Sequence, residues 1–265
     1  MEKLLVHKNS GPSLLIKVKD VIIGGSEKVI ISGPCSVEEY DKMQAIAKGL
    51  KKAGVHILRG GAFKPRTSPY DFQGLQEEGL KILKSVGMEF NMPIVTEVMD
   101  TKDIDLVSNY ADMLQIGSRN MYNYSLLKEV GKLKIPILLK RGMSATLSEW
   151  LHAAEYILCN GNENVVLCER GIRSFETYTR NTLDLSIVAA IKLNYRIPII
   201  VDPSHGTGIR ELVEPMSLAS IAAGADGLMI ESHVDPNCAV SDARQTVSIE
   251  TIEAIVKNVK KFEKF

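Results

Sequence analysis

Several features are scarce or absent in this chain of 265 residues, and each absence excludes a class of protein. The 32 Lys and Arg residues balance 32 Asp and Glu residues, so bulk charge predicts no attraction to nucleic acid or to a membrane. No apolar run is long enough to span a bilayer, and no cationic segment leads into an apolar run at the start. The four cysteines form no C-x-x-C pair, which is typical of a reducing compartment. We therefore expect a cytoplasmic protein.

What the chain does contain is a regular alternation of two patterns. Short apolar runs that end in Gly or polar residues predict strands at 29–35, 55–61, 93–99, 113–120, 136–142, 164–171, 198–205 and 227–233. Helical spacing of apolar residues predicts helices at 40–53, 74–90, 103–109, 124–132, 146–160, 181–195, 216–223 and 248–262. This alternation predicts an α/β fold, a single (β/α)₈ barrel. The alternative is a doubly wound open sheet, although no G-x-G-x-x-G follows an early strand.

The first 28 residues differ from the rest of the chain. Residues 13–18 and 21–23 are apolar-rich and precede Gly24-Gly25, which predicts an N-terminal hairpin that closes the bottom of the barrel or docks loosely against it. Residues 29–265 form the predicted catalytic barrel, and we expect no separate regulatory domain because too few residues lie outside it. Helix ends are predicted by capping boxes at Ser36/Glu39 and Thr146/Glu149 and by Gly54.

Potential metal ligands lie at or after the ends of the first predicted strand and of the last two, and the first and last strands are neighbours in a closed barrel. These residues are Cys35, His205, Glu231 and Asp242. Taken singly, each has a simpler explanation: a core cysteine, a hydrogen-bonded loop histidine, and two solvated carboxylates. Together they would suit one divalent transition-metal ion. Of the other histidines, His233 is the reserve candidate because it shares strand parity with Glu231.

Cationic side chains concentrate at the same predicted ends of the strands. They are Arg59, Lys64, Arg66, Arg119, Lys140, Arg170 and Arg173. Strand alternation predicts that most of them point into one barrel mouth, and the same parity would turn Val201, Pro203 and His205 inward. Strand ends are often charged simply because they meet water, but converging Arg and Lys suit phosphate and carboxylate groups. Thr67 and Ser68 add hydroxyl donors.

These segments resemble those of a known enzyme family. They are Gly33-Pro34-Cys35-Ser36, Leu58-Arg59-Gly60-Gly61-Ala62-Phe63-Lys64-Pro65-Arg66-Thr67-Ser68, Gln115-Ile116-Gly117-Ser118-Arg119-Asn120, Leu139-Lys140-Arg141-Gly142, Glu169-Arg170-Gly171, Asp202-Pro203-Ser204-His205-Gly206 and Ile230-Glu231-Ser232-His233. From about residue 29 to about residue 247 the chain resembles 3-deoxy-D-arabino-heptulosonate 7-phosphate (DAHP) synthase. The similarity is to its compact branch, which is related to 3-deoxy-D-manno-octulosonate 8-phosphate synthase.

The resemblance implies a TIM barrel that joins phosphoenolpyruvate to erythrose 4-phosphate at the entry to the shikimate pathway. It implies metal ligation by Cys35, His205, Glu231 and Asp242, with Mn, Fe, Co and Zn all tolerated. Phosphoenolpyruvate would be bound by the cations at positions 59, 64, 119, 140 and 170, and the erythrose phosphate by Arg66, Thr67 and Ser68. Lys64, His205 and Cys35 are the catalytic candidates, and Glu97 is a further candidate for proton transfer.

Two features favour the heptulosonate enzyme over its relative. The segment Lys64-Pro65-Arg66-Thr67-Ser68 replaces the Ala-Asn-Arg-Ser-Ser-like segment expected of the octulosonate enzyme, and Cys35 stands where metal-independent octulosonate enzymes carry Asn. The rivals are relaxed aldose-phosphate specificity, a metal-dependent aldolase or isomerase, and a non-catalytic barrel that binds a phosphorylated metabolite. We also expect a homo-oligomer, either a dimer or a tetramer.

Overall fold

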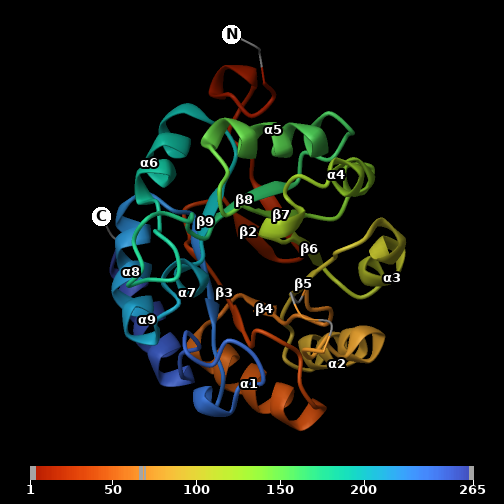
Figure 1. The fold of residues 1–265 in the computed structure, drawn as a ribbon, viewed down its shortest axis with the longest axis vertical. Helices are drawn as coiled ribbons and strands as arrows, with labels where there is room; N and C mark the ends of the chain where they lie inside the picture. The colour runs from red at the N-terminus through yellow and green to blue at the C-terminus, as the bar shows by residue number, and fades with distance from the viewer. Residues whose placement is uncertain (1–3, 66–67, 69, 263–265) are drawn as a thin grey trace.

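Eight parallel strands in the described part of the chain close into a barrel, with helices around its outside (Figure 1). The structure is a computed structural model and describes residues 4–65, 68 and 70–262. The barrel strands are β3 (Val29–Gly33), β4 (Ile57–Arg59), β5 (Ile94–Glu97), β6 (Met113–Ile116), β7 (Ile137–Lys140), β8 (Val165–Glu169), β9 (Ile199–Val201) and β10 (Gly227–Glu231). Strands that are consecutive in this series pair in parallel, and β10 also pairs with β3. The predicted (β/α)₈ barrel is therefore confirmed, and the open sheet is wrong.

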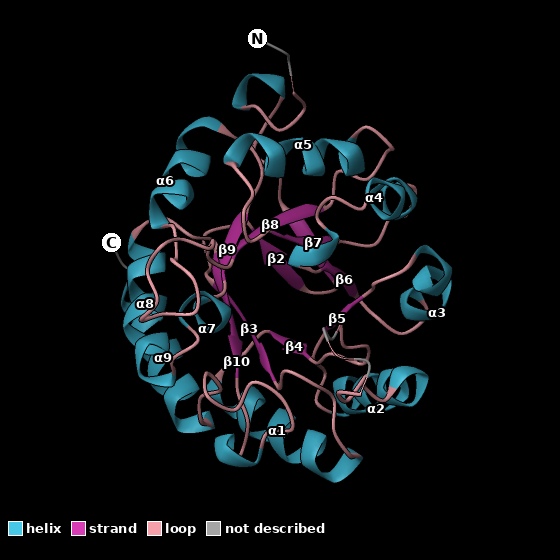
Figure 2. Ribbon diagram, viewed as in Figure 1, coloured by secondary structure: helices cyan, strands magenta, loops and turns pink. Residues whose placement is uncertain are grey.

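The longer helices surround the barrel and bury apolar side chains against it, whereas a short helix, Pro203–Thr207, lies at the carboxyl end of β9 (Figure 2). The helices are α1 (Tyr40–Ala53), α2 (Gln76–Glu89), α3 (Ile104–Ser108), α4 (Tyr124–Gly131), α5 (Leu147–Leu158), α6 (Leu185–Asn194), α7 (Pro203–Thr207), α8 (Arg210–Ala222) and α9 (Ile249–Phe262). Short 3₁₀ turns lie at Lys8–Ser10, Thr101–Asp103, Ser118–Asn120 and Pro236–Cys238. In α9 the buried residues Ile252, Ile255, Val256 and Val259 recur every three or four positions. None of the helices in the described ranges is both long and apolar enough to cross a membrane.

The starts of two helices and one predicted cap differ from the prediction, and α6 begins at Leu185 rather than at residue 181. Helix α8 begins at Arg210 rather than at residue 216, because Pro215 lies inside the helix instead of before it. The capping box at Thr146 and Glu149 is confirmed, since each side chain accepts a hydrogen bond from the other residue's backbone N–H. The capping box at Ser36 and Glu39 is wrong, because α1 starts at Tyr40 without a side-chain cap. Gly54 ends α1 at φ 88°, as predicted.

The N-terminal hairpin forms the floor of the barrel. Strands β1 (Ile16–Val18) and β2 (Val21–Ile23) pair antiparallel. The buried side chains of Ile16, Val18 and Ile23 form one hydrophobic cluster with barrel-interior residues such as Val29 and Met113, the first residues of their strands. The hairpin is thus packed against the lower end of the barrel and is not a loosely docked arm.

The barrel interior changes from apolar to polar along each strand. The hydrophobic cluster above the hairpin contains Ile31, Ile57, Val95, Met113, Leu138, Ile200 and Met229. Two residues further along, where alternation returns the side chain to the interior, stand Gly33, Arg59, Glu97, Gln115, Lys140, Asp202 and Glu231. The sequence therefore builds an apolar lower layer and a polar layer at the carboxyl ends of the strands, where barrel active sites lie.

The predicted parity of β9 is wrong. Ile200 belongs to the interior cluster, whereas Val201 packs in the outer core between strands and helices. Because Ile199–Val201 is apolar throughout, alternation could not be read from the sequence. Asp202 takes the inward position, and His205 comes to the site from the first turns of α7.

Candidate metal centre and anion pocket

His205 is placed by the short helix α7. Asp202 is the N-cap of this helix, and Pro203 occupies its first turn, where the missing N–H costs nothing. The Asp202 carboxylate accepts a hydrogen bond from the backbone N–H of His205 at 2.9 Å and lies 2.7 Å from its Nδ1. Since a carboxylate only accepts, Nδ1 carries a proton and Nε2 keeps its lone pair. The same helix start therefore fixes the position and the tautomer of the imidazole.

Burial of these groups sets their protonation. Burial lowers the pKa of His205 below its ordinary value, although Asp202 and Glu231 oppose that change. Burial alone would raise the pKa of Asp202, but His205 and Lys140 outweigh it and hold this pKa well below the usual range. The Lys140 ammonium lies 2.5 Å from the same carboxylate. At neutral pH the site thus contains a neutral imidazole and a charged carboxylate.

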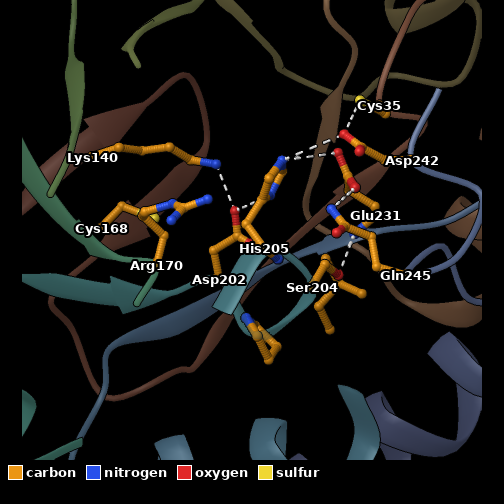
Figure 3. A network of polar contacts seen from close by, with 12 residues as sticks. Cys35, Lys140, Cys168, Arg170, Asp202, Ser204, His205, Glu231, Asp242 and Gln245 are labelled. Carbon is orange, nitrogen blue, oxygen red and sulfur yellow. Dashed lines mark hydrogen bonds and ion pairs between the residues drawn. The ribbon is translucent and has the colours of Figure 1, made fainter. Parts of the chain in front are cut away.

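Three further potential ligands, Cys35, Glu231 and Asp242, converge beside this imidazole (Figure 3). One ligand atom each of Cys35, Glu231 and Asp242 lie within 4.8 Å of one another. The Nε2 atom of His205 lies 3.4 Å from Glu231 Oε1 and 4.0 Å from Asp242 Oδ2. The donor set of thiol, imidazole and two carboxylates fits a divalent transition-metal ion, since the carboxylates balance charge and the softer donors favour transition metals.

The backbone supports this convergence. Glu231 ends β10 and Cys35 follows β3, and these two strands are neighbours in the barrel. Asp242 adopts φ +54°, a left-handed conformation in which Asp is more frequent than most residues. Such conformations concentrate at functional sites. The site therefore joins the first and last strands of the closed barrel.

Two cations lie against this cluster and offset its negative charge. Arg59 donates to Glu231 Oε1 at 2.7 Å, and Lys64 donates to Cys35 Sγ at 2.9 Å. Burial and the nearby Glu231 raise the pKa of Cys35 to about 12, despite Lys64. Burial would also raise the pKa of Glu231, but His205 and Arg59 hold it below its ordinary value. At neutral pH these pKa values make Cys35 a thiol and Glu231 a carboxylate.

A polar pocket opens directly beside the cluster. Its lining includes six cations from the carboxyl ends of β4, β6, β7 and β8 and the loops that follow them: Arg59, Lys64, Arg119, Lys140, Arg170 and Arg180. Arg59, Lys140 and Arg170 are at most 5% exposed. Arg170 makes no ion pair with a described residue, and burial lowers its pKa. A pocket of buried and partly unpaired cations favours substrates that carry several negative charges.

Glu97 brings one carboxylate into this cationic pocket. It is the last residue of β5, and Gln115 donates to it at 3.0 Å. Gly117 leaves the room that this side chain occupies, because a Cβ at position 117 would lie 2.1 Å from Glu97 Oε1. Any side chain at position 117 would therefore displace the Glu97 carboxylate.

The remaining predicted residues fall into three groups. Arg66 and Thr67 lie outside the described residues, so their proposed contact with the erythrose phosphate stays a prediction. Ser68 accepts a hydrogen bond from the backbone of Tyr70 and is not in the pocket lining. The Nε2 atom of His233 lies 3.3 Å from Glu38 Oε1, outside the ligand cluster. The prediction of His233 as a reserve ligand, which rested on its strand parity with Glu231, is therefore wrong.

Several residues of the site were missed. Asp202 and Gln115 lie in segments that the sequence singled out, but neither was given a role there. The signal for Asp202 was available, because Asp before Pro is typical of a helix start. Arg180 and Gln245 come from irregular segments that have no periodicity to place them. Only the closed barrel brings them to the ligand cluster.

Comparison with known proteins identifies the relatives of this chain. The sequence pattern of the DAHP synthetase I family matches residues 7–264. A phospho-2-dehydro-3-deoxyheptonate aldolase of Thermotoga maritima is 46% identical over 259 residues, which are 98% of this chain and 77% of the relative. A 2-dehydro-3-deoxyphosphooctonate aldolase of Fusobacterium nucleatum is 29% identical and is matched over 91% of this chain and 93% of its own length.

Solved structures give the same result. The crystal structure of the Thermotoga maritima aldolase, a DAHP synthase, superposes with a TM-score of 0.95 at 45% identity, covering 98% of this chain and 77% of that one. A truncated form of the 3-deoxy-D-arabino-heptulosonate 7-phosphate synthase from Thermotoga maritima gives a TM-score of 0.91 at 44% identity, covering 97% and 95% of the two chains.

Proposed function

The chain belongs to the DAHP synthetase I family, and we propose that it condenses phosphoenolpyruvate with erythrose 4-phosphate and water to give 3-deoxy-D-arabino-heptulosonate 7-phosphate and inorganic phosphate. The observation that carries the proposal is the contact between the ligand cluster and the pocket of cations at one barrel mouth. This arrangement suits a reaction that joins two phosphorylated substrates, one of them an aldehyde. The octulosonate alternative is not favoured, because its relatives are more distant.

The pocket cations are proposed to bind phosphoenolpyruvate. Arg59, Lys64, Arg119, Lys140 and Arg170 all line it and would hold the phosphate and carboxylate groups of this substrate. Arg66, Thr67 and Ser68 are proposed to hold the phosphate of erythrose 4-phosphate. Two anionic substrates repel each other in water, so fixed guanidinium and ammonium groups lower the cost of bringing their carbons together.

We propose that Cys35, His205, Glu231 and Asp242 hold a divalent ion, Mn, Fe, Co or Zn, next to this pocket. When bound there, such an ion would supply Lewis-acid chemistry at the aldose carbonyl that C3 of phosphoenolpyruvate attacks. Water then adds at C2, and the phosphate leaves by cleavage of its C–O bond. Lys64 Nζ lies 2.9 Å from Cys35 Sγ and also lines the pocket, so it is placed to hold or move a proton between the two substrates. Glu97 is the second candidate because its carboxylate lines the same pocket.

A phosphate-release assay tests this function. We expect release of inorganic phosphate only when phosphoenolpyruvate and erythrose 4-phosphate are both present, with loss on exhaustive chelation and recovery on adding Mn²⁺ or Co²⁺. A panel of four- and five-carbon aldose phosphates measures specificity. An equal or higher rate with a five-carbon sugar would favour the octulosonate reaction, and no release with any aldose would refute the proposal.

We further propose that residues 29–265 form one catalytic domain and that the chain assembles as a homodimer or homotetramer. Apolar side chains are exposed on several outer helices, among them Leu193 at 72% and Met88 at 68% exposure, and burying such groups between copies would favour self-association. Sedimentation equilibrium measures the assembly, and a monomer at micromolar concentration would contradict it.

A further inference from the structure

A buried glutamine, Gln245, contacts Glu231 of the ligand cluster. Its side chain is 2% exposed, and its Nε2 donates to Glu231 Oε2 at 2.6 Å. Its Oε1 accepts from Arg180 Nη1 at 3.0 Å. Figure 3 shows Gln245 next to Glu231, on the side away from Lys140. The amide therefore links a partly exposed arginine to a fully buried carboxylate.

The orientation of this amide follows from the chemistry of its two neighbours. An arginine can only donate, so the amide oxygen must face Arg180. A carboxylate can only accept, so the NH₂ group must face Glu231. Arg180 thus determines which end of the Gln245 amide meets the glutamate.

The two oxygens of Glu231 have different neighbours. Oε2 accepts from Gln245, whereas Oε1 lies 2.7 Å from Arg59 Nη1 and 3.4 Å from His205 Nε2. Rotation of the carboxylate would break the Gln245 bond inside a buried site, where an unpaired polar group costs about 1–3 kcal/mol. Oε1 is consequently held on the His205 side.

We propose that Gln245 is a positioning residue for the cation site: it holds Glu231 Oε2 so that Oε1 stays directed at the centre of the ligand cluster, and Arg180 fixes the amide in that orientation. This inference rests on the proposal that Glu231 is a metal ligand. Partners that orient metal ligands in this way set the affinity of a site as well as its geometry.

Backbone hydrogen bonds join Gln245 and Arg180 to the segments that carry the proposed ligands. The N–H of Gln245 donates to the carbonyl of Asp242 at 3.1 Å, so one turn carries both a proposed ligand and the residue that positions another. Arg180 comes from the segment between β8 and α6, and its backbone N–H donates to Thr207 at 2.8 Å. Arg180 and Gln245 therefore join the segments that follow β8, β9 and β10.

Substitution of Gln245→Met tests the proposal, because methionine keeps the length and volume and removes both hydrogen bonds. We expect Co²⁺ affinity, measured by equilibrium dialysis on the full chain, to fall by about 10–100-fold. The visible absorption of the bound Co²⁺ should change shape, and kcat should fall. The KM for phosphoenolpyruvate should stay within about twofold, because the hydrogen-bond partners of the Gln245 side chain are Glu231 and Arg180 and not the five cations proposed to bind this substrate. Gln245→Asn, which keeps the amide but is too short to reach both partners, should show the same direction of change.

Gln44→Met is the matched control. Gln44 donates to Glu89 at 2.8 Å, but this pair lies on an exposed surface. The Gln44→Met substitution should leave the Co²⁺ affinity and the Co²⁺ absorption spectrum unchanged. Thermal melting without metal identifies a variant that fails to fold, in which case Gln245→Asn carries the test. If wild-type protein binds Co²⁺ and a folded Gln245 variant binds it equally well with the same spectrum, the positioning role is refuted. If wild-type protein binds no Co²⁺, the metal site itself is refuted.

Discussion

The Asp202 carboxylate lies 2.7 Å from Nδ1 of His205 and directs the opposite ring nitrogen at the ligand cluster. One side chain thus caps helix α7, selects the histidine tautomer and also pairs with Lys140 of the anion pocket. The proposed metal centre and the proposed phosphoenolpyruvate site consequently share a buried carboxylate, and a change at Asp202 should affect both.

Asp202→Asn should weaken metal binding by about 10–100-fold, because the amide no longer selects the tautomer whose Nε2 is free to bind a metal. The KM for phosphoenolpyruvate should also change, since Lys140 loses its counter-charge. Equilibrium dialysis and steady-state kinetics measure the two effects. Asp226→Asn is the control: Asp226 is also buried and pairs with Lys192 at 2.6 Å, but it precedes β10 at the opposite end of the barrel. Equal metal affinity in the two variants would contradict this prediction.

Metal affinity should rise with pH. The metal-free thiol of Cys35 has a pKa of about 12 and is protonated at neutral pH, whereas the bound form is a thiolate, so binding releases a proton. Below pH 12 each unit increase should therefore strengthen Co²⁺ binding by up to about tenfold from this group. Proton release on Co²⁺ binding is measured in weak buffer, and thiolate coordination is measured by the thiolate-to-Co²⁺ charge-transfer absorption.

Cys35→Ser should abolish the thiolate-to-Co²⁺ charge-transfer absorption, and Cys35→Asn should reduce the enzymatic activity. The exposed Cys159 provides the control, and Cys159→Ser should change neither. Metal binding that is independent of pH, with no thiolate absorption, would show that Cys35 is not a ligand.

Arg170→Met should weaken phosphoenolpyruvate binding without destabilising the fold. Arg170 is 4% exposed and has no ion-pair partner among the described residues, so removing its charge leaves no buried carboxylate unpaired. We expect the KM for phosphoenolpyruvate to rise about 10–100-fold, as for the loss of a charged hydrogen bond. The free energy of unfolding in urea should stay equal or increase. Arg173 lies on the exposed surface, and Arg173→Met should alter neither the KM for phosphoenolpyruvate nor the free energy of unfolding. A normal KM in Arg170→Met would show that Arg170 does not bind phosphoenolpyruvate.

The hairpin floor should be required for stability. Ile23→Ala removes a fully buried side chain from the cluster at the lower end of the barrel and should cost about 2–5 kcal/mol in the free energy of unfolding. Its neighbour Ile22 is 48% exposed, and Ile22→Ala should cost less than about 0.5 kcal/mol. Urea denaturation of both variants makes the comparison, and equal losses would mean that the hairpin does not close the barrel.

Much of the site could be located from the chain alone. Arg59, Lys140 and Glu231 are charged residues that end short apolar strands, and the closed barrel brings these strand ends to one mouth as predicted. The family resemblance is confirmed by the match over residues 7–264. The roles of the individual side chains stay predictions, to be tested by the substitutions above.

The sequence by itself determined the alternation of strands and helices, the polar upper layer of the barrel and the family, because these depend on local periodicity and on motifs. The tertiary structure decided which way β9 faces, since its apolar run has no alternation, and it placed His205 through a helix turn rather than through strand parity. It also decided that Gln245 meets both Glu231 and Arg180, because contacts between irregular segments depend on how the closed barrel brings them together.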